Sequence, residues 1–302
     1  MKFQDIANNS REMLAMTAYT LEEFTALIPW FEKSFVESTY TLEGKERKNQ
    51  PCHYKNSPLP TLEDKLFFIL VYTKQYPTQT LHGKSFDMSQ PKANQWIHFL
   101  LPILQSALSK AGELPCRDMK ELPQQKVSVF AHDGTERPIL RPKNKDLQKQ
   151  FFSGKQKKHT VKNNALANEL CKVIYLTPTV EGKKHDKKLA DESCYALPEG
   201  SVLLQDTGFQ GFTVENVSII QPKKKPKGKE LTQDEKEANR AISKIRVRIE
   251  HVINGVKRYR IVKDTCRNWL KGFKDRIMEI ACGLHNFRLN FRPWKLIEFQ
   301  VE

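Results

Sequence analysis

The stretch Val127-Ser-Val-Phe-Ala-His-Asp-Gly-Thr-Glu136 joins an apolar, strand-like run to a carboxylate, Asp133, that follows it closely. The same pattern recurs at Val202-Leu-Leu204, which is followed by Asp206. A third acid, Glu250, lies inside a stretch with helical periodicity. Carboxylates delivered by two strand ends and one helix can together hold two divalent cations, which activate a water and stabilise a leaving oxygen at a phosphodiester.

Each acid also has a simpler explanation. Asp133-Gly and Asp206-Thr-Gly are turn sequences, and aspartate often follows a strand because it closes a turn. Glu250 stands four residues after Arg246, a spacing that also suits an exposed ion pair worth only a few tenths of a kcal/mol. The presence of all three acids favours the metal site. Glu136, three residues after Asp133, is a candidate accessory ligand.

The helix expected around Glu250 has a clear apolar stripe, formed by Ile242, Ile245, Ile249, Val252, Ile253 and Val256. Arg246, Glu250 and Lys257 are separated by four and seven residues, so at about 100° per residue they share a face beside that stripe. A carboxylate between two cations can bind a metal while its neighbours hold phosphate oxygens.

Charge and composition restrict the function. The 302 residues carry a formal net charge of +15, which favours a polyanionic partner. No run approaches the roughly 18 apolar residues of a membrane span, and the N-terminus lacks a signal-peptide pattern, so we expect a soluble, intracellular protein without membrane contact. The six cysteines form no C-x-x-C pair, which favours reduced, packed thiols over a zinc site.

Two basic segments are suited to a phosphate backbone. The first runs from Arg141 to Lys162 with Phe151 and Phe152 interleaved, and the second runs from Lys223 to Lys229. The candidate contacts are Arg141, Lys155, Lys157, Lys158, Lys162, Lys223, Lys224 and Lys225. Such residues give affinity without sequence information. The alternatives are a solvated charge run and, for the second segment, a nuclear-import signal.

The N-terminal third is expected to be helical. Thr20 has the character of an N-cap, and Glu23 completes a capping box before an apolar-periodic run that reaches Phe31. Residues 41–58 are polar and rich in Lys, Asn and Pro, which is typical of a linker. Thr61 then begins a second helix.

Residues 78–86 and 90–104 are expected to form two helices joined by a turn. The apolar face of the second is Ala93, Trp96, Ile97, Leu100 and Leu101. This leaves outward Lys92, Asn94, Gln95 and His98. The arrangement is compatible with a helix-turn-helix whose second helix enters a major groove. A purely structural bundle has the same periodicity, but the basic charge favours DNA reading, with Lys92, Asn94 and Gln95 as candidate contacts.

The predicted domain organisation has four parts. Residues 1–110 form a helical DNA-binding domain, 111–124 a linker, 125–292 an α/β domain, and 293–302 a tail. Strands are expected at 127–130, 159–163, 172–176, 202–204 and 217–220, with helix from Thr232 onward. A mixed sheet followed by packing helices indicates one α/β catalytic domain.

The chain resembles the DDE-superfamily transposases of bacterial insertion sequences. The resemblance is to the insertion-sequence-five type, which has relatives among Harbinger-like elements. The motifs that carry the resemblance are Asp133–Ile139, Ser153–Lys155, His159–Lys162, His185-Asp186, Gln205–Gly211, and the spacing of Arg246, Glu250 and Lys257. These motifs occur in the family's order. The resemblance covers nearly the whole chain, from the helix-turn-helix after Leu59 to the segment Cys282–Arg288.

The resemblance implies a ribonuclease H-like fold in which Asp133, Asp206 and Glu250 bind metal. Arg246 and Lys257 match the family's Arg-x3-Glu-x6-Lys pattern, which is associated with handling transposon-end DNA. Glu136, His185 and Asp186 are expected to be accessory. Many relatives carry a tyrosine three residues before that arginine, whereas this chain has Ser243.

The function implied is a DNA transposase that uses two Mg²⁺ ions, for which Mn²⁺ can substitute. It would bind the terminal inverted repeats of its element as a homodimer or larger assembly, cleave the ends, and join them to target DNA. Two alternatives remain open. One is a ribonuclease H-like nuclease that cuts without joining, and the other is a catalytically silent DNA-binding regulator.

Overall fold

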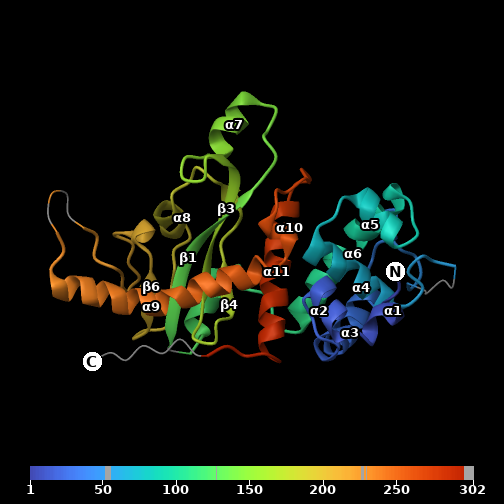
Figure 1. Ribbon diagram of the computed structural model, residues 1–302, viewed down its shortest axis with the longest axis horizontal. Coiled ribbons are helices and arrows are strands. Elements are labelled where there is room, and N and C mark those ends of the chain that lie inside the picture. The colour runs from blue at the N-terminus through green and yellow to red at the C-terminus, as the bar shows by residue number, and fades with distance from the viewer. Residues whose placement is uncertain (52–55, 127, 226–227, 229, 296–302) are drawn as a thin grey trace. The chain divides into compact units, whose positions relative to one another are not determined.

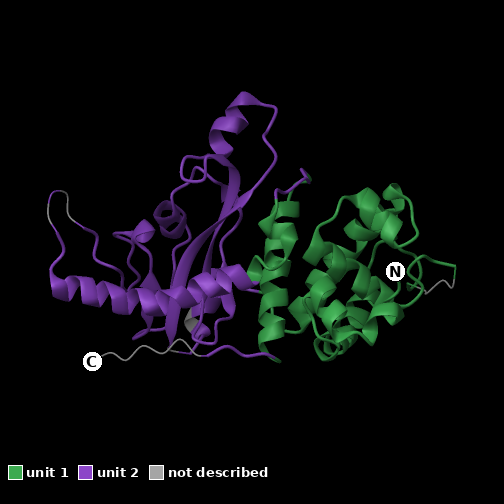
Figure 2. Ribbon diagram, viewed as in Figure 1, with its two compact units in different colours: residues 1–114, 256–264, 270–291 green, residues 115–255, 265–269, 292–302 purple. Residues whose placement is uncertain are grey.

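A computed structural model describes residues 1–51, 56–126, 128–225, 228 and 230–295. The chain divides into two compact units, coloured in Figure 2. The helical unit comprises residues 1–114, 256–264 and 270–291, and the sheet unit comprises 115–255, 265–269 and 292–302. None of the helices in the described part of the chain is long and apolar enough to cross a membrane.

The helical unit contains α1 (Phe3–Ala7), α2 (Ser10–Thr17), α3 (Leu21–Val36), α4 (Leu62–Gln75), α5 (Gln79–Ser85), α6 (Gln90–Lys110), α10 (Arg260–Lys263) and α11 (Phe273–Leu289). The predicted capping box is confirmed, because Thr20 N–H donates to Glu23 Oε2 at 2.8 Å and Glu23 N–H donates to Thr20 Oγ1 at 3.2 Å. The structure also confirms two helices across the predicted helix-turn-helix, although the second continues to Lys110.

The C-terminal helix α11 packs with the N-terminal helices, within residues that the sequence prediction assigned to the α/β domain. Its partners are specific: Tyr19 Oη donates to the Leu284 carbonyl at 2.9 Å, and Asn286 Nδ2 donates to the Glu113 carbonyl at 2.9 Å. Residues on all sides of α11 are buried. A helix buried all round needs several partners, but periodicity does not reveal which elements supply them.

A buried histidine gives the helical unit a predictable pH dependence. His82 lies among aromatic rings, with the Phe68 ring centroid 4.2 Å away, and burial lowers its pKa to about 3. Folding therefore keeps His82 neutral, whereas the unfolded chain takes up a proton below pH 6.5. Stability is fully present above pH 6.5 and is lost as the pH falls toward 3, by about 1.4 kcal/mol at pH 5.5. Between pH 7.5 and 5.5, we expect the free energy of unfolding of His82→Phe to fall by about 1.4 kcal/mol less than that of wild type. Urea denaturation at the two pH values measures this difference. An equal loss in both proteins would contradict the prediction.

The sheet unit contains strands β1 (Val129–Pro138), β2 (Phe152–Ser153), β3 (Lys158–Ala167), β4 (Val173–Leu176), β5 (Val180–Glu181), β6 (Val202–Gln205) and β7 (Ser218–Ile220). The sheet order is β2-β3-β1-β6-β7, and β4 and β5 also pair with β3. β1 is antiparallel to β3 but parallel to β6, and β6 is parallel to β7. This mixed sheet agrees with the predicted fold class (Figure 1).

Helices and short turns complete the sheet unit: η1 (Met119–Gln124), α7 (Lys145–Phe151), α8 (Asp186–Glu192), η2 (Thr207–Phe209) and α9 (Gln233–Val256). The predicted apolar stripe of α9 is largely confirmed, since Ile249, Val252 and Ile253 are buried. Ile242 and Ile245 are only half-buried. The long helix crosses the sheet in Figure 1, where it is drawn in orange.

β1 is longer than the sequence predicts. It does not end at Phe130 but continues through Asp133 to Pro138, paired antiparallel with β3. The interpretation of Asp133-Gly134 as a turn is therefore wrong. Backbone pairing with the ten-residue β3 extends the strand through polar residues that have no strong strand preference of their own. Val127, the predicted first residue of this strand, lies outside the described residues.

Candidate active site

The sheet register brings the first two acids together. β1 and β6 run parallel, and His132 pairs with Gln205. Asp133 and Asp206 are the next residues on these neighbouring strands, so both follow the last paired positions on the same side of the sheet. Asp133 accepts a hydrogen bond from Gly134 N–H at 2.8 Å, and Asp206 accepts one from Thr207 N–H at 2.6 Å.

Arg246 joins the second acid to the third. On α9, its Nη1 lies 3.2 Å from Asp206 Oδ1, and its Nη2 lies 3.2 Å from Glu250 Oε1. The side chain of Arg246 is 17% exposed, against 52% for Glu250. The arginine thus spans the gap between a strand end and the helix, and it brings the predicted acids of two elements to one place.

The third link is electrostatic. Burial raises the pKa of Asp133 to about 6, opposed by the Gly134 N–H and by the positive charge of Arg246. The negative charges of Asp206 and Asp186 raise the pKa further. Asp133 is therefore within electrostatic reach of both Arg246 and Asp206. Asp186, predicted as an accessory residue, belongs to the same neighbourhood.

A largely buried ion network lies beside these acids. Lys162 Nζ lies 3.3 Å from Glu136 Oε1 and 3.0 Å from Asp186 Oδ1, and it donates to the Lys184 carbonyl at 2.9 Å. The Lys162 side chain is only 7% exposed. Lys162 was predicted as a phosphate contact, but the structure gives it internal carboxylate partners instead. Lys162 lies on β3 within residues 160–167, all of which are buried.

Gly134 is where this network meets the acid pair. A Cβ at position 134 would lie 2.5 Å from Asp186 Oδ1, well inside contact distance. We expect Gly134→Ala to displace Asp186 and to destabilise the protein by about 1–3 kcal/mol, the usual cost of overpacking. Gly154→Ala is the matched control, because a Cβ there meets nothing within 4 Å and should change stability by less than about 0.5 kcal/mol. Equal urea midpoints for the two variants would show that Asp186 does not need this space.

The donor set suits hard cations. Asp133, Asp206 and Glu250 supply only carboxylate oxygens, the ligands that Mg²⁺ and Mn²⁺ prefer. Across residues 1–51, 56–126, 128–225, 228 and 230–295, however, no three acidic, histidine or cysteine side chains are close enough together to hold a metal ion as they stand. The three carboxylates are suitable ligands for a divalent cation. In this structure the guanidinium of Arg246 supplies the positive charge between Asp206 and Glu250.

The histidines near the acids divide between packing and exposure. His132 is fully buried, with its Nε2 2.9 Å from Tyr195 Oη and its ring centroid 4.0 Å from that of Phe209. Burial lowers the pKa of His132 to about 3, so His132 is a packing residue. His185 is exposed at the N-cap of α8, directly before Asp186.

Lys257 departs from the predicted helix face. α9 ends at Val256, and Lys257 lies in the turn that follows. Residue 257 does not continue the helical repeat of Arg246 and Glu250, which form the predicted i,i+4 pair at 3.2 Å. The apolar stripe ends at Val256, the same residue at which the helix ends.

The first basic segment forms an arm between β1 and β3 that carries α7 and extends from the sheet in Figure 1. Its cations are exposed: Arg141, Lys155, Lys157 and Lys158. The arm also exposes Leu147 and Phe152, at 41% and 43%. This mixture of cations and exposed apolar side chains is compatible with nucleic-acid contact.

In the second basic segment, Lys223 pairs with Glu235 and Lys225 pairs with Glu230. Lys224 is exposed. Pro226, Lys227 and Lys229, which belong to the predicted run, lie outside the described residues. The acidic partners lower the net charge that this segment offers to DNA.

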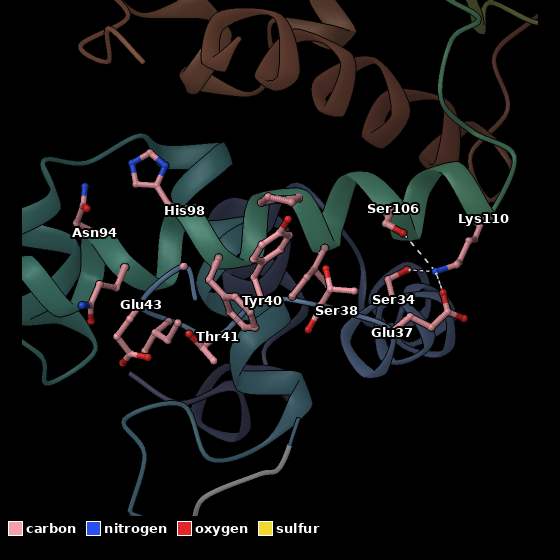
Figure 3. A pocket seen from close by; sticks show the side chains of 17 residues that line it. Ser34, Glu37, Ser38, Tyr40, Thr41, Glu43, Asn94, His98, Ser106 and Lys110 are labelled. Atoms are coloured by element: carbon pink, nitrogen blue, oxygen red, sulfur yellow. Dashed lines mark hydrogen bonds and ion pairs between the residues drawn. The ribbon is translucent and has the colours of Figure 1, made fainter. Parts of the chain in front are cut away.

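The predicted reading face of α6 is partly covered. Lys92, Asn94 and Gln95 are half-buried rather than fully outward. Asn94 and Gln95 line a pocket of about 670 Å³ with residues 38–44 (Figure 3). At one end of this pocket Lys110 donates to Ser34 Oγ and Ser106 Oγ, both at 3.2 Å.

Residues 39–47 form a turn fastened to α6. Thr41 N–H donates to the Lys45 carbonyl at 2.8 Å, and Arg47 N–H donates to the Thr39 carbonyl at 2.7 Å. The Arg47 guanidinium lies 5.8 Å from the centroid of the Phe99 ring on α6. Residues 41–47 of this turn belong to the segment 41–58 that the sequence predicted as a plain linker, and the turn lines the same pocket as Asn94 and Gln95.

Comparison with known proteins identifies the family. Residues 132–286 match the family model described as DDE superfamily endonuclease, and residues 57–110 match the helix-turn-helix of DDE superfamily endonuclease. The chain belongs to the DDE superfamily of insertion-sequence transposases. It is 31% identical over 233 residues to a probable transposase for insertion sequence element IS702 from Microchaete diplosiphon. The aligned region covers 77% of this chain and 82% of that relative. No solved structure matches the chain.

Proposed function

We propose that the protein cleaves DNA at the ends of its own element and joins the resulting 3′-hydroxyls to target DNA. The observation that supports this proposal is that Arg246 pairs with both Asp206 and Glu250, while the register of β1 and β6 sets Asp133 beside Asp206. These acids come from β1, from the residue directly after β6, and from α9. Divalent ions, Mg²⁺ or Mn²⁺, would be held by the three carboxylates and would activate a water and stabilise the leaving oxygen.

The remaining residues have supporting roles in this proposal. Exposed cations of the arm, Lys155, Lys157 and Lys158, hold the phosphate backbone by counterion release. The ion pairs of Lys162 with Glu136 on β1 and Asp186 on α8 hold these two elements together beside Asp133. In this proposal, the helix-turn-helix that the family model matches at residues 57–110 binds the terminal inverted repeats. Both ends must be held at once, so the working form is a dimer or larger.

The test uses a supercoiled plasmid that carries the native DNA flanking the gene. Wild-type protein and Asp133→Asn are incubated with it in Mg²⁺ or in EDTA, and the cut sites and joined products are mapped by sequencing. We expect cuts at the element boundaries, and joined products, with wild type in Mg²⁺ alone. Cuts without joined products would indicate a nuclease that cleaves DNA but does not join the ends to a target. Binding to the flanks without metal-dependent cuts would indicate a DNA-binding regulator.

A further inference from the structure

The guanidinium of Arg246 occupies the position between two of the three predicted metal ligands. It contacts Asp206 Oδ1 and Glu250 Oε1 through different nitrogens, each at 3.2 Å. Its side chain is 17% exposed, so this pairing is shielded from solvent more than an ordinary surface ion pair. The half-exposed Glu250 forms the outer side of the arrangement, at 52%.

This pairing and a bound metal exclude each other. Mg²⁺ holds its oxygen ligands at about 2.1 Å and needs them around one point. Here Asp206 and Glu250 face separate nitrogens of a planar fork, with the guanidinium between them. An ion that both carboxylates bind would also lie beside a fixed positive charge. Arg246 must therefore leave before the carboxylates can converge on a metal.

A DNA phosphate is the group best able to draw Arg246 away. A guanidinium binds carboxylate and phosphate through the same bidentate geometry, and it is more weakly hydrated than a lysine ammonium. A chain with net charge +15 attracts a phosphate backbone to its surface. Of the two carboxylates that pair with Arg246, Glu250 is the more exposed, at 52%. An incoming phosphate therefore displaces Glu250 from the guanidinium first.

We propose that Arg246 is a resident cation that closes the site until DNA arrives, and that its transfer from Asp206 and Glu250 to a DNA phosphate couples DNA binding to metal binding. This inference rests on the proposed function, because it needs the three acids to be metal ligands. Coupling of this kind is reciprocal: DNA raises the affinity for metal, and metal raises the affinity for DNA by the same factor.

The experiment measures Mn²⁺ affinity by electron paramagnetic resonance on the full chain. Each protein is titrated alone and with a duplex of native flanking DNA, and Mn²⁺ bound by the duplex alone is subtracted. For wild type we expect the duplex to raise Mn²⁺ affinity about tenfold or more, within the usual range of coupling. For Arg246→Gln we expect tighter Mn²⁺ binding without DNA, and little further gain on adding the duplex.

Two further variants separate this role from a general loss of charge. Arg248→Gln removes the same charge from the same helix, about 200° around the helix axis from Arg246, and should retain the wild-type coupling. Arg246→Lys keeps the charge but lacks the two-nitrogen fork, so it should lose most of the coupling. If Arg246→Gln folds poorly, Arg246→Lys, which keeps the positive charge, takes its place in the comparison.

The outcomes distinguish the two proposals. Absence of Mn²⁺ binding to wild type, with or without DNA, would overturn the metal site and the proposed function with it. Mn²⁺ binding of equal strength with and without DNA, unchanged in Arg246→Gln, would overturn the role of Arg246 alone. Equal coupling in Arg246→Gln and Arg248→Gln would do the same.

Discussion

Glu250→Gln is expected to slow metal-dependent cleavage at the element ends by three or more powers of ten. The variant removes a carboxylate charge that would help to hold a cation worth several kcal/mol of transition-state stabilisation, and each 1.36 kcal/mol is a factor of ten in rate. Folding should be unaffected, because the side chain of Glu250 is 52% exposed and glutamine has nearly the same shape. Rates are measured on the supercoiled plasmid in Mg²⁺.

Glu237→Gln is the matched control for this experiment. Glu237 lies on the same helix, is exposed, and has Gln233 as a hydrogen-bond partner at 2.9 Å. Its replacement should leave the cleavage rate within about twofold of wild type, since a surface charge far from the site changes little. Cleavage by Glu250→Gln at the control's rate would remove Glu250 from the catalytic centre.

Lys162→Met is expected to produce the largest loss of stability, about 3–5 kcal/mol. Removing one partner of a buried ion network leaves the other charges without compensation. Glu136 and Asp186 would then face each other across the space that Lys162 Nζ fills, at side-chain exposures of 10% and 23%. The urea midpoint, followed by circular dichroism, measures the loss.

Lys187→Met supplies the comparison for the buried network. Lys187 pairs with Asp191 on α8 at 2.6 Å, but both side chains are more than a third exposed, at 38% and 45%. An exposed pair contributes only about 0–1 kcal/mol. The combined variant Lys162→Met, Glu136→Gln, Asp186→Asn should recover part of the lost stability. Equal midpoints for Lys162→Met and Lys187→Met would show that the network does not stabilise the sheet unit.

The elements that the sequence predicted correctly are those in which local preference and burial agree. Apolar runs identified β4, β6 and β7 to within about two residues, and the Thr20 capping box located the start of α3. β1 is the contrasting case, because residues 131–138 are polar and turn-like. Only pairing with β3, some thirty residues later in the chain, makes them a strand.

The site was predictable where a short spacing determines it. Arg246 and Glu250 form the expected i,i+4 pair because that spacing holds on any helix. The internal role of Lys162 was not predictable, since a lysine in a basic run looks the same whether it faces solvent or carboxylates from two other elements. The cover that residues 39–47 place beside α6 is likewise a tertiary contact, which periodicity within α6 does not report.

The central claim is that Asp133, Asp206 and Glu250 hold metal at one place. Iron-mediated backbone cleavage tests it most directly: Fe²⁺ replaces Mg²⁺, peroxide generates radicals at the metal, and mass spectrometry locates the cuts in the protein bound to its DNA. We expect cuts near residues 133, 206 and 250 in the same sample, all suppressed by excess Mg²⁺. Cuts near only one of these positions, or cuts that Mg²⁺ does not suppress, would contradict the account.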